Sequence, residues 1–401
     1  MHQKLSRSFF TATTTTLVFV LAACGGGGGG GGGGTATTAT GIFKDNNVTG
    51  ATFTSGAETG TTGTDGSFTY EVGQPVAFSV GGVTLGSATG QPVITPVDLI
   101  PSGTTSTQEV INLTRFILML DVDGDPSNGI EISSAVQAVA DTWPAVDFST
   151  ADLATELASI ISDASSADGT SHSLPDSSTA QSHLEATLRC VRAGGYRGTF
   201  TGDDSGPFGV LVDAGTGFLS GYAFSASDGL LTLTGSSAVS LDQNATFISG
   251  QASSGATFSG QFDNSNDISG NWDLSITNES GTFSGSRIGG APNAVYRFTG
   301  DFTTTSGSVF ANGLFTFDID SADNVTGMAL TVYATDGTTN EVAPFTGTLS
   351  GTTLNASIFD GSTLDATITG TLNTSAGTVG GTWSDMDGNS GSFSGSGCRL
   401  N

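Results

Sequence analysis

The sequence GTFSGS at residues 281–286 returns as GSFSGS at residues 391–396. In both copies Phe and the glycines stand among Ser and Thr, and the surrounding residues alternate apolar with polar. Alternation with a period of two indicates β-strands that bury one face and leave the other in water. A stretch that recurs at a fixed place indicates a duplicated unit. We therefore predict two β repeats, repeat 1 over 194–290 and repeat 2 over 291–401.

Two further matches support the duplication. GNW at 270–272 recurs as GTW at 381–383, and Tyr196-Arg197 recurs as Tyr296-Arg297, so the two units begin and end alike. Each unit contains about eight short alternating segments separated by turn residues. Eight strands in series suit a closed antiparallel meander β-barrel, because closure removes exposed strand edges. A β-sandwich in place of each barrel remains the alternative.

The alternation also predicts which side chains face the barrel interiors. Large residues beside Gly on one face fit the interior of a small barrel. We expect the following sets to point inward: Tyr196, Gly198 and Phe200; Phe315, Phe317 and Ile319; Met328, Leu330 and Val332.

Residues 41–100 predict a small β-sandwich. Short alternating runs are interrupted there by Gly, Asn and Asp, as in an antiparallel fold with tight turns. The runs VTGATF at 48–53 and GTDGSF at 63–68 resemble the transthyretin-like modules related to carboxypeptidase regulatory domains. This resemblance implies a spacer or stalk.

Residues 101–193 predict a small helical subdomain. From Ser106 the apolar residues follow a helical period, and Ser106 with Glu109 has the pattern of a capping box. Further helices are expected over 132–140, after Ser149 and over 179–191, and a polar loop is expected over 162–178. The fold class is therefore mainly β with a helical connector between a sandwich and two barrels.

An Asp-rich loop follows the first of these helices. Asp121, Asp123 and Asp125 alternate by two, and Asn128 follows, so their oxygens are spaced as a hard cation such as calcium requires. The loop resembles that of an EF-hand or dockerin, although Pro126 stands where that family has glycine. A shortened calcium site with these four ligands and a simple Asp/Asn turn remain open alternatives.

The sequence favours a protein that is not an enzyme. No GxSxG or HExxH pattern is present. The two histidines beyond the N-terminal region, His172 and His183, are expected on the surface, in the polar loop and on the exposed side of the last helix. Glu279 and Glu341 occupy unlike places in the two repeats, so they do not form a duplicated carboxylate pair.

The N-terminus has the layout of a secretory signal. Lys4 and Arg7 precede an apolar run over 17–23, which is too short to span a bilayer. The sequence LAAC at 21–24 resembles the bacterial lipobox. This resemblance implies a signal peptide over 1–23, lipidation of Cys24 and a Gly/Thr linker over 24–40. Gly25 in place of Asp implies anchoring at the cell outer membrane, on its periplasmic or its surface-exposed side.

Two more cysteines remain, Cys190 before the repeats and Cys398 near their end. In an exported chain two cysteines predict a disulfide. By the chain-entropy model, closing so long a loop contributes roughly 4–5 kcal/mol.

The net charge of the chain restricts the classes of partner that it is expected to bind. Asp and Glu number 37 against 10 Lys and Arg, which gives a formal net charge of −27. Such a surface repels nucleic acid and attracts cationic groups, so no nucleic-acid partner is expected. Solubility in an extracellular setting is the alternative explanation of the acidity.

The TFSG endings of the repeats resemble the barrel lobes of surface receptor lipoproteins of the transferrin-binding type, which implies a binding lobe. Together these features predict a non-catalytic, lipid-anchored envelope or surface protein. Its predicted role is to bind or adhere to an extracellular glycan or protein. A structural envelope lipoprotein without a ligand and a polysaccharide hydrolase with paired carboxylates are the alternatives.

Overall fold

The computed structural model describes residues 36–263, 267–291, 293–335 and 339–400. The predicted signal peptide, Cys24 and the glycine run lie outside these residues. The described chain is mainly β, as the sequence predicts, with two closed barrels, three small sheets and six helices among the described residues.

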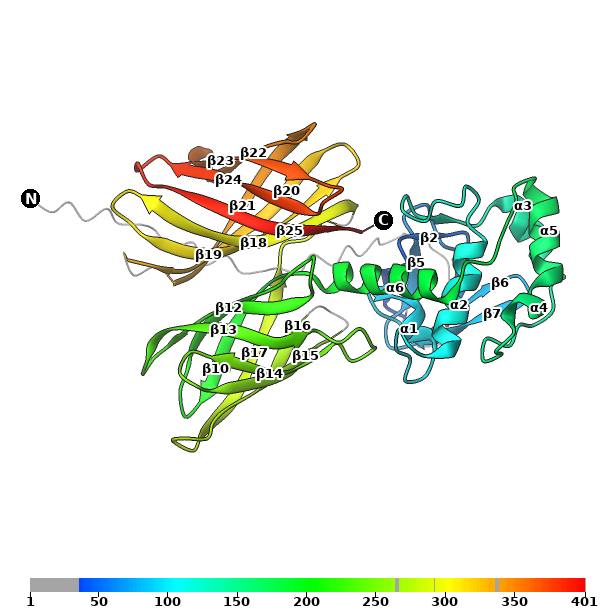
Figure 1. Ribbon diagram of the computed structural model, residues 1–401, viewed down its shortest axis with the longest axis horizontal. Helices are drawn as coiled ribbons and strands as arrows, with labels where there is room; N and C mark the ends of the chain where they lie inside the picture. The colour runs from blue at the N-terminus through cyan, green and yellow to red at the C-terminus, as the bar shows by residue number, and fades with distance from the viewer. Residues whose placement is uncertain (1–35, 264–266, 292, 336–338, 401) are drawn as a thin grey trace, which may run out of the picture. The chain divides into compact units, whose positions relative to one another are not determined.

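The first repeat forms a closed antiparallel barrel, barrel 1, whose eight strands follow one another in chain order (Figure 1, green). The meander barrel predicted from the sequence is confirmed, and the sandwich alternative is wrong. Its strands are β10 (Gly194–Gly202), β11 (Gly206–Val212), β12 (Phe218–Ser225), β13 (Gly229–Ala238), β14 (Thr246–Ala252), β15 (Thr257–Phe262), β16 (Asp267–Leu274) and β17 (Glu279–Ile288).

The second repeat forms barrel 2 with the same order of strands (Figure 1, yellow to red). Its strands are β18 (Ala294–Ser306), β19 (Ala311–Asp320), β20 (Asn324–Ala334), β21 (Thr339–Ser350), β22 (Thr353–Asp360), β23 (Thr363–Asn373), β24 (Thr378–Asp385) and β25 (Ser390–Arg399).

The two copies of the repeated hexapeptide lie on the strands that close the barrels, β17 and β25. Gly198 pairs with Gly285 across the seam of barrel 1, and Gly300 pairs with Gly395 across the seam of barrel 2. A Cβ atom added at Gly198 would lie 2.0 Å from the Ser284 carbonyl oxygen, so the seam admits only glycine there. The repeated stretch therefore marks the place where each sheet closes on itself.

The strand register corrects one match between the repeats. Phe200 pairs with Phe283 on the closing strand, and Phe302 pairs with Phe393 in the same way. Tyr196 is therefore equivalent to a residue two positions after Tyr296. The Tyr-Arg match of the two sequences is two residues out of structural register.

One predicted inward face lies outside its barrel. Met328, Leu330 and Val332 of β20 cluster with Leu211 and Ile288 of barrel 1. The alternate residues of β20 contribute to the interior of barrel 2. The prediction was wrong because both faces of β20 are buried, one by its own barrel and one by the other, so alternation does not identify the interior.

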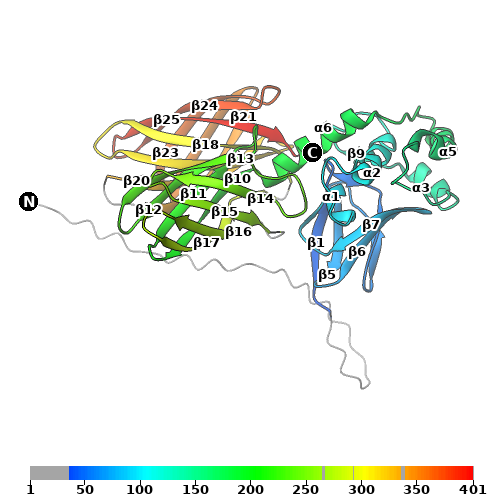
Figure 2. The ribbon, with the colours of Figure 1, turned by 60° about the horizontal axis from the view of Figure 1, so that its bottom comes forward.

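Short strands form small sheets in the N-terminal region (Figure 2). One sheet has the order β5-β1-β8, another has the order β4-β3-β6-β7, and β2 pairs with β9. The strands are β1 (Thr38–Phe43), β2 (Val48–Thr49), β3 (Thr52–Ser55), β4 (Glu58–Thr61), β5 (Ser67–Glu71), β6 (Pro75–Val80), β7 (Val83–Thr89), β8 (Val93–Ile94) and β9 (Ile130–Glu131).

Along the chain, the helices lie between β8 and barrel 1, with β9 between the second and the third of them. They are α1 (Pro96–Leu99), α2 (Gln108–Met119), α3 (Ser134–Ala140), α4 (Leu153–Glu156), α5 (Ala158–Asp168) and α6 (Ser177–Arg192). The residue that caps α2 is Thr107, whose side chain makes no capping bond, so the capping box predicted at Ser106 is wrong. That motif is found at α1, where Thr95 and Asp98 form it. The predicted loop over 162–178 is also partly wrong, because α5 extends to Asp168.

One apolar core joins the small sheets to the helices. It includes Phe43 and Phe78, whose stacked rings lie 4.5 Å apart, and Phe116 of α2. Strand β9 comes from the helical segment and pairs with β2 of the strand segment. The segments 41–100 and 101–193 therefore share their hydrophobic core.

The last turn of α6 is bonded to both barrels. The Tyr196 hydroxyl donates to the Arg192 carbonyl at 3.0 Å. Arg287 of barrel 1 donates to the carbonyls of Val191 and Ala193. The last carbonyls of a helix lack partners within it, so these side chains supply the donors that the buried helix end needs.

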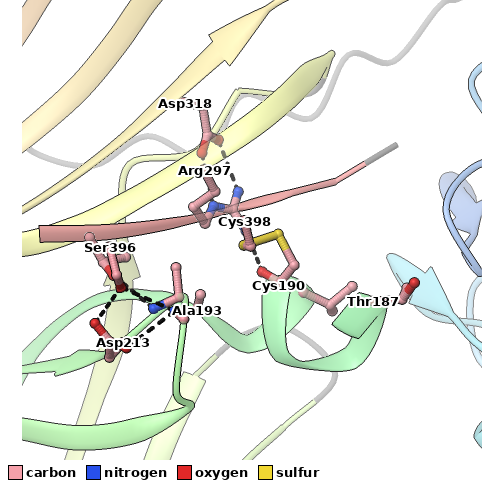
Figure 3. The surroundings of a disulfide bond; sticks show 12 residues. Thr187, Cys190, Ala193, Asp213, Arg297, Asp318, Ser396 and Cys398 are labelled. Atoms are coloured by element: carbon pink, nitrogen blue, oxygen red, sulfur yellow. Dashed lines mark hydrogen bonds and ion pairs between the residues drawn. A yellow bond between two sulfur atoms is a disulfide. The ribbon is translucent and has the colours of Figure 1, made fainter. Parts of the chain in front are cut away.

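Barrel 2 reaches the same helix end covalently (Figure 3). Cys190 of α6 is bonded to Cys398 of β25, at a sequence separation of 208. Beside it, Arg297 makes a bidentate ion pair with Asp318 at 2.8 and 2.9 Å and donates to the Cys190 carbonyl at 3.5 Å. Both members of this pair are buried, so each satisfies a charge that would otherwise be unpaired.

We expect replacement of Cys190 and Cys398 by Ala to lower the free energy of unfolding by about 5 kcal/mol, because the disulfide restricts a very long loop in the unfolded chain. Thermal and denaturant unfolding of the oxidised proteins measures the change. Reduced wild type is the control and should match the variant. Equal stability of the oxidised wild type and the variant would contradict the expectation.

Candidate functional site

Barrel 1 has two unlike ends. Four of its seven hairpins turn at one end, which we call the tip end, through residues 203–205, 226–228, 253–256 and 275–278. The other end, which we call the helix end, begins at Gly194, directly after α6.

The helix end of barrel 1 is filled by aromatic side chains. Tyr196 is fully buried, and its ring centroid lies 4.8 Å from that of Phe262. Phe247 packs on the ring of Phe262, with the two ring centroids 5.4 Å apart. Access to the interior from this end is therefore blocked.

The tip end of barrel 1 is hollow. A cavity of about 90 Å³ lies between the strands, and its walls are almost entirely aromatic and aliphatic. The rings of Phe200 and Trp272 meet edge to face at 6.1 Å on its wall. The other apolar residues that line it are Phe208, Val210, Leu219, Ala223, Leu231, Leu233, Phe247, Ala252, Ala256, Phe258, Ile268, Leu274 and Phe283.

Barrel 2 fills the equivalent space on one wall. At two equivalent register positions it has Phe317 and Phe345 where barrel 1 has Val210 and Leu233. The two Phe rings meet at 6.1 Å within the core of barrel 2. Because Val and Leu are smaller, the wall of barrel 1 formed by β11 to β13 borders a cavity.

On the opposite wall the larger side chains belong to barrel 1. Barrel 1 has Phe247 and Phe258 where barrel 2 has Leu354 and Ile368. The distribution of the large side chains, rather than their number, therefore distinguishes the two interiors.

The opening of the cavity is acidic. Asp204, Asp228 and Glu279 line it, and Asp228 is exposed, so the cavity reaches solvent here. Burial raises the pKa of Asp204, but hydrogen bonds from the Ser225 and Ser227 hydroxyls and from two backbone amides outweigh burial and hold the pKa below its ordinary value. Asp204 is therefore an anion and a hydrogen-bond acceptor rather than a proton donor.

In the Asp-rich loop, side-chain oxygens of Asp123 and Asp125 accept hydrogen bonds from neighbouring residues. Asp123 Oδ1 accepts the Asp125 amide at 2.9 Å, and Asp123 Oδ2 accepts Asn128 Nδ2 at 2.9 Å. Asp125 Oδ1 accepts the Ser127 amide at 3.1 Å. These are the bonds of Asp/Asn turns, which is the alternative left open by the sequence.

Asp121 differs from its neighbours because it is buried. Its Oδ1 accepts the Glu131 amide at 3.0 Å, and its Oδ2 has no hydrogen-bond partner. Burial, together with the nearby carboxylates of Asp123 and Asp125, raises its pKa to about 6, and the bond from the Glu131 amide opposes the shift. Within the described ranges, no three His, Cys, Asp or Glu side chains converge as a metal site. Calcium stays a prediction for this loop.

His172 is buried and His183 is partly buried, and both contact other parts of the chain, which corrects the surface positions expected from the sequence. His172 lies 2.8 Å from the Met119 carbonyl and 3.0 Å from Asp168. His183 Nε2 lies 3.4 Å from a carboxylate oxygen of the fully buried Asp45. The contacts with Met119 and Asp45 come from distant segments, so the polar sequence neighbours of the two histidines gave no sign of them.

The comparisons with known proteins place the chain in no family. No protein-family model matches it, and no curated protein has a significant sequence match. Barrel lobes of surface lipoproteins are among the solved structures that resemble parts of it.

One of these structures is a variant of transferrin-binding protein B from Haemophilus parasuis Hp5, with a TM-score of 0.20 and 11% identity over 52% of this chain and 76% of that one. Another is a surface lipoprotein, with a TM-score of 0.19 and 14% identity over 33% and 75%. A third is intact Ap-TbpB with its N and C lobes, with a TM-score of 0.18 and 10% identity over 49% and 66%. At these values the likeness assigns neither a ligand nor a family to this chain.

Across the part of the chain that the structure describes, none of the helices has the length and apolar character needed to cross a membrane.

The buried Asp45 generates a pH prediction. Burial raises its pKa from 3.8 to about 6, and His183 opposes the shift. The protonated form therefore stabilises the folded chain below about pH 4, and this contribution is lost as the pH rises through about 6.

We expect Asp45→Asn to be more stable than wild type at pH 8, by up to about 3 kcal/mol, with the difference vanishing near pH 4. Urea unfolding between pH 4 and pH 8 measures it. Asp141→Asn, at an exposed carboxylate, is the control and should not change the pH profile. Parallel profiles for wild type and Asp45→Asn would rule out the assignment.

Proposed function

We propose that this chain is a non-catalytic, lipid-anchored binding protein of the cell envelope, and that the hollow tip end of barrel 1 holds its ligand. The cavity between the hairpins carries the proposal. Small-molecule sites are concave and mostly apolar, with a few polar groups at defined places. The tip end of barrel 1 has each of these properties.

The contrast between the barrels argues against a purely structural role. Protein interiors are close-packed, and an unfilled space costs stability. Barrel 2 has the same topology and packs Phe317 and Phe345 against each other. The scaffold therefore folds with that wall filled, so the hollow in barrel 1 is not a requirement of the fold.

The electrostatics argue against a polysaccharide hydrolase. Such an enzyme needs one carboxylic acid that stays protonated beside a carboxylate. Asp204 has a lowered pKa and accepts hydrogen bonds from Ser225 and Ser227. The cavity walls also present rings and alkyl groups, whereas a sugar needs many polar partners.

The proposal also includes the lipid anchor and the outer-membrane location that the sequence predicts. Lipidation of Cys24, followed by ten glycines, would hold the folded chain at the outer membrane on a flexible tether. The sequence predicts a glycan or a protein as the ligand. The small apolar cavity restricts the part of the ligand that it can hold to a small apolar group. An engineered closed cavity of about 150 Å³ binds benzene, and the cavity of barrel 1 is smaller, at about 90 Å³, but open at one end, so we choose a single ring as the probe of this site.

Calcium in the Asp-rich loop is a further part of the proposal. The unpartnered Oδ2 of Asp121 and the carboxylates of Asp123 and Asp125 repel one another, and a cation would relieve that repulsion. Its role there would be to stiffen the loop before β9.

We expect 2-phenylethanol to bind barrel 1 and to change the fluorescence of Trp272. The reporter carries Trp143→Phe and Trp383→Phe, which leaves Trp272 as its only tryptophan. Its emission should shift saturably as the ring enters the cavity beside the indole. The matched control keeps Trp383, the equivalent residue of barrel 2, and should not respond.

Filling the cavity should abolish the response. Val210→Phe with Leu233→Phe introduces the residues that barrel 2 has at these positions, and Ala223→Val is a milder filling if the pair does not fold. Unfolding curves establish that each variant is folded. An unchanged response in a filled, folded variant, or equal responses of Trp272 and Trp383, would overturn the proposal.

We expect Cys24→Ser to move the protein from the membrane fraction to the soluble fraction, because the thiol that accepts lipid is lost. The native protein should show added acyl mass at this residue by mass spectrometry. Cys398→Ser is the control and should leave the protein in the membrane fraction. Retention of Cys24→Ser in the membrane would exclude a lipid anchor at this residue.

A further inference from the structure

We propose that the ligand of barrel 1 is a small amphiphile with a cationic head, an organic amine whose apolar group enters the cavity and whose ammonium group lies among Asp204, Asp228 and Glu279. This inference rests on the proposed function and names its ligand class.

The three carboxylates surround the opening from different hairpins. Asp204 lies in the turn between β10 and β11, Asp228 in the turn between β12 and β13, and Glu279 at the start of β17. All three line the same cavity as Trp272. A molecule that fills the apolar part of the cavity therefore has its outer end next to acidic groups.

Two further carboxylates lie at this end of the barrel. Asp203 Oδ2 accepts the Ser280 amide at 2.9 Å, in the same turn as Asp204. Asp273 Oδ1 accepts the Ser275 hydroxyl, close to Glu279 along the chain. They add negative potential around the opening without lining the cavity itself.

Among the described residues, no Lys, Arg or His forms an ion pair with the three carboxylates that line the cavity. Between Arg197 and Arg287 the sequence contains no Lys, Arg or His. The side-chain groups that donate to these carboxylates are neutral: Asp204 accepts the Ser225 and Ser227 hydroxyls, and Glu279 accepts the Thr277 hydroxyl at 2.8 Å. Hydroxyl groups satisfy the oxygens but leave the negative charge, so a bound cation is favoured and a bound anion is repelled.

The aromatic side chains near the opening add to this preference. Trp272 and Phe200 line the cavity, and their rings meet edge to face. Aromatic faces attract ammonium groups by about 0.5–1 kcal/mol at exposed sites and by more where water is excluded. Apolar walls, aromatic rings and acidic groups together are complementary to an amine with an apolar body.

Barrel 2 also has acidic groups at its hairpin ends, but its interior is packed differently from that of barrel 1. Its hairpin ends also carry carboxylates, among them Asp360 and the exposed Asp387. The interior behind them is packed by Phe315, Phe317 and Phe393. It is therefore a matched comparison, with acidic hairpin ends in front of an interior whose described residues pack large rings against one another.

The test compares three probes that share one ring and a short chain: 2-phenylethylammonium, 2-phenylethanol and phenylacetate. Their dissociation constants are measured at pH 7 and low salt with the Trp272 reporter. We expect the ammonium to bind roughly tenfold more tightly than the alcohol, and phenylacetate to bind more weakly than both. Added salt should reduce the preference for the ammonium and leave the alcohol unchanged.

Variants assign the preference to the three carboxylates. The combination Asp204→Asn, Asp228→Asn and Glu279→Gln should remove the advantage of the ammonium while the alcohol binds as before. The barrel 2 control, Asp360→Asn with Asp387→Asn, should leave the binding of every probe unchanged.

The outcomes distinguish failure of the cationic ligand from failure of the proposed binding site. Equal affinity for ammonium and alcohol in the wild type would overturn the cationic ligand and leave the proposed binding site intact. Failure of all three probes to bind would overturn both. A preference for the ammonium that survives the triple variant would place the cation elsewhere and contradict this assignment.

Discussion

The end of α6 is the constraint on which the arrangement of the barrels depends. Its last carbonyls are buried and need donors, and Tyr196, Arg287 and Arg297 supply them from two different barrels. The disulfide from Cys190 adds a covalent bond to the last strand of barrel 2. Burial lowers the pKa of Arg287 to about 10, so this guanidinium stays charged at neutral pH.

This constraint also determines which end of barrel 1 is available. The side chains that cap α6 and fill the helix end occupy the interior from that side, with Tyr196 against Phe262. The hairpin turns lie at the other end, and the cavity opens among them. In the described part of barrel 1 the cavity therefore opens among turns whose carboxylates are part of its wall, so the proposed binding site and its proposed charge preference lie at the same end.

The sequence predicted the barrels because their closure depends on local residue types. Paired glycines at the seam, such as Gly198 with Gly285, are required where the strands approach closely, so they appear as a repeated motif. The outward face of β20 could not be predicted, since Leu330 is equally apolar whether it packs inside its own barrel or against the other one.

The candidate site was missed for a related reason. A cavity depends on the summed volumes of side chains from several strands, and Val210 in barrel 1 against Phe317 in barrel 2 becomes informative only once the register is known. The buried position of Asp45 beside His183 likewise depends on contacts between segments far apart in the chain. Glu279, which the sequence set aside as half of a catalytic pair, lies at the opening of the cavity.

The most direct test of the account is a methyl NMR titration of the intact folded chain with 2-phenylethylammonium. The account predicts saturable shifts at Val210, Leu233 and Ile268 of barrel 1, and none at Val325, Leu354 and Ile368 of barrel 2. Shifts spread equally over both barrels, or confined to barrel 2, would contradict it.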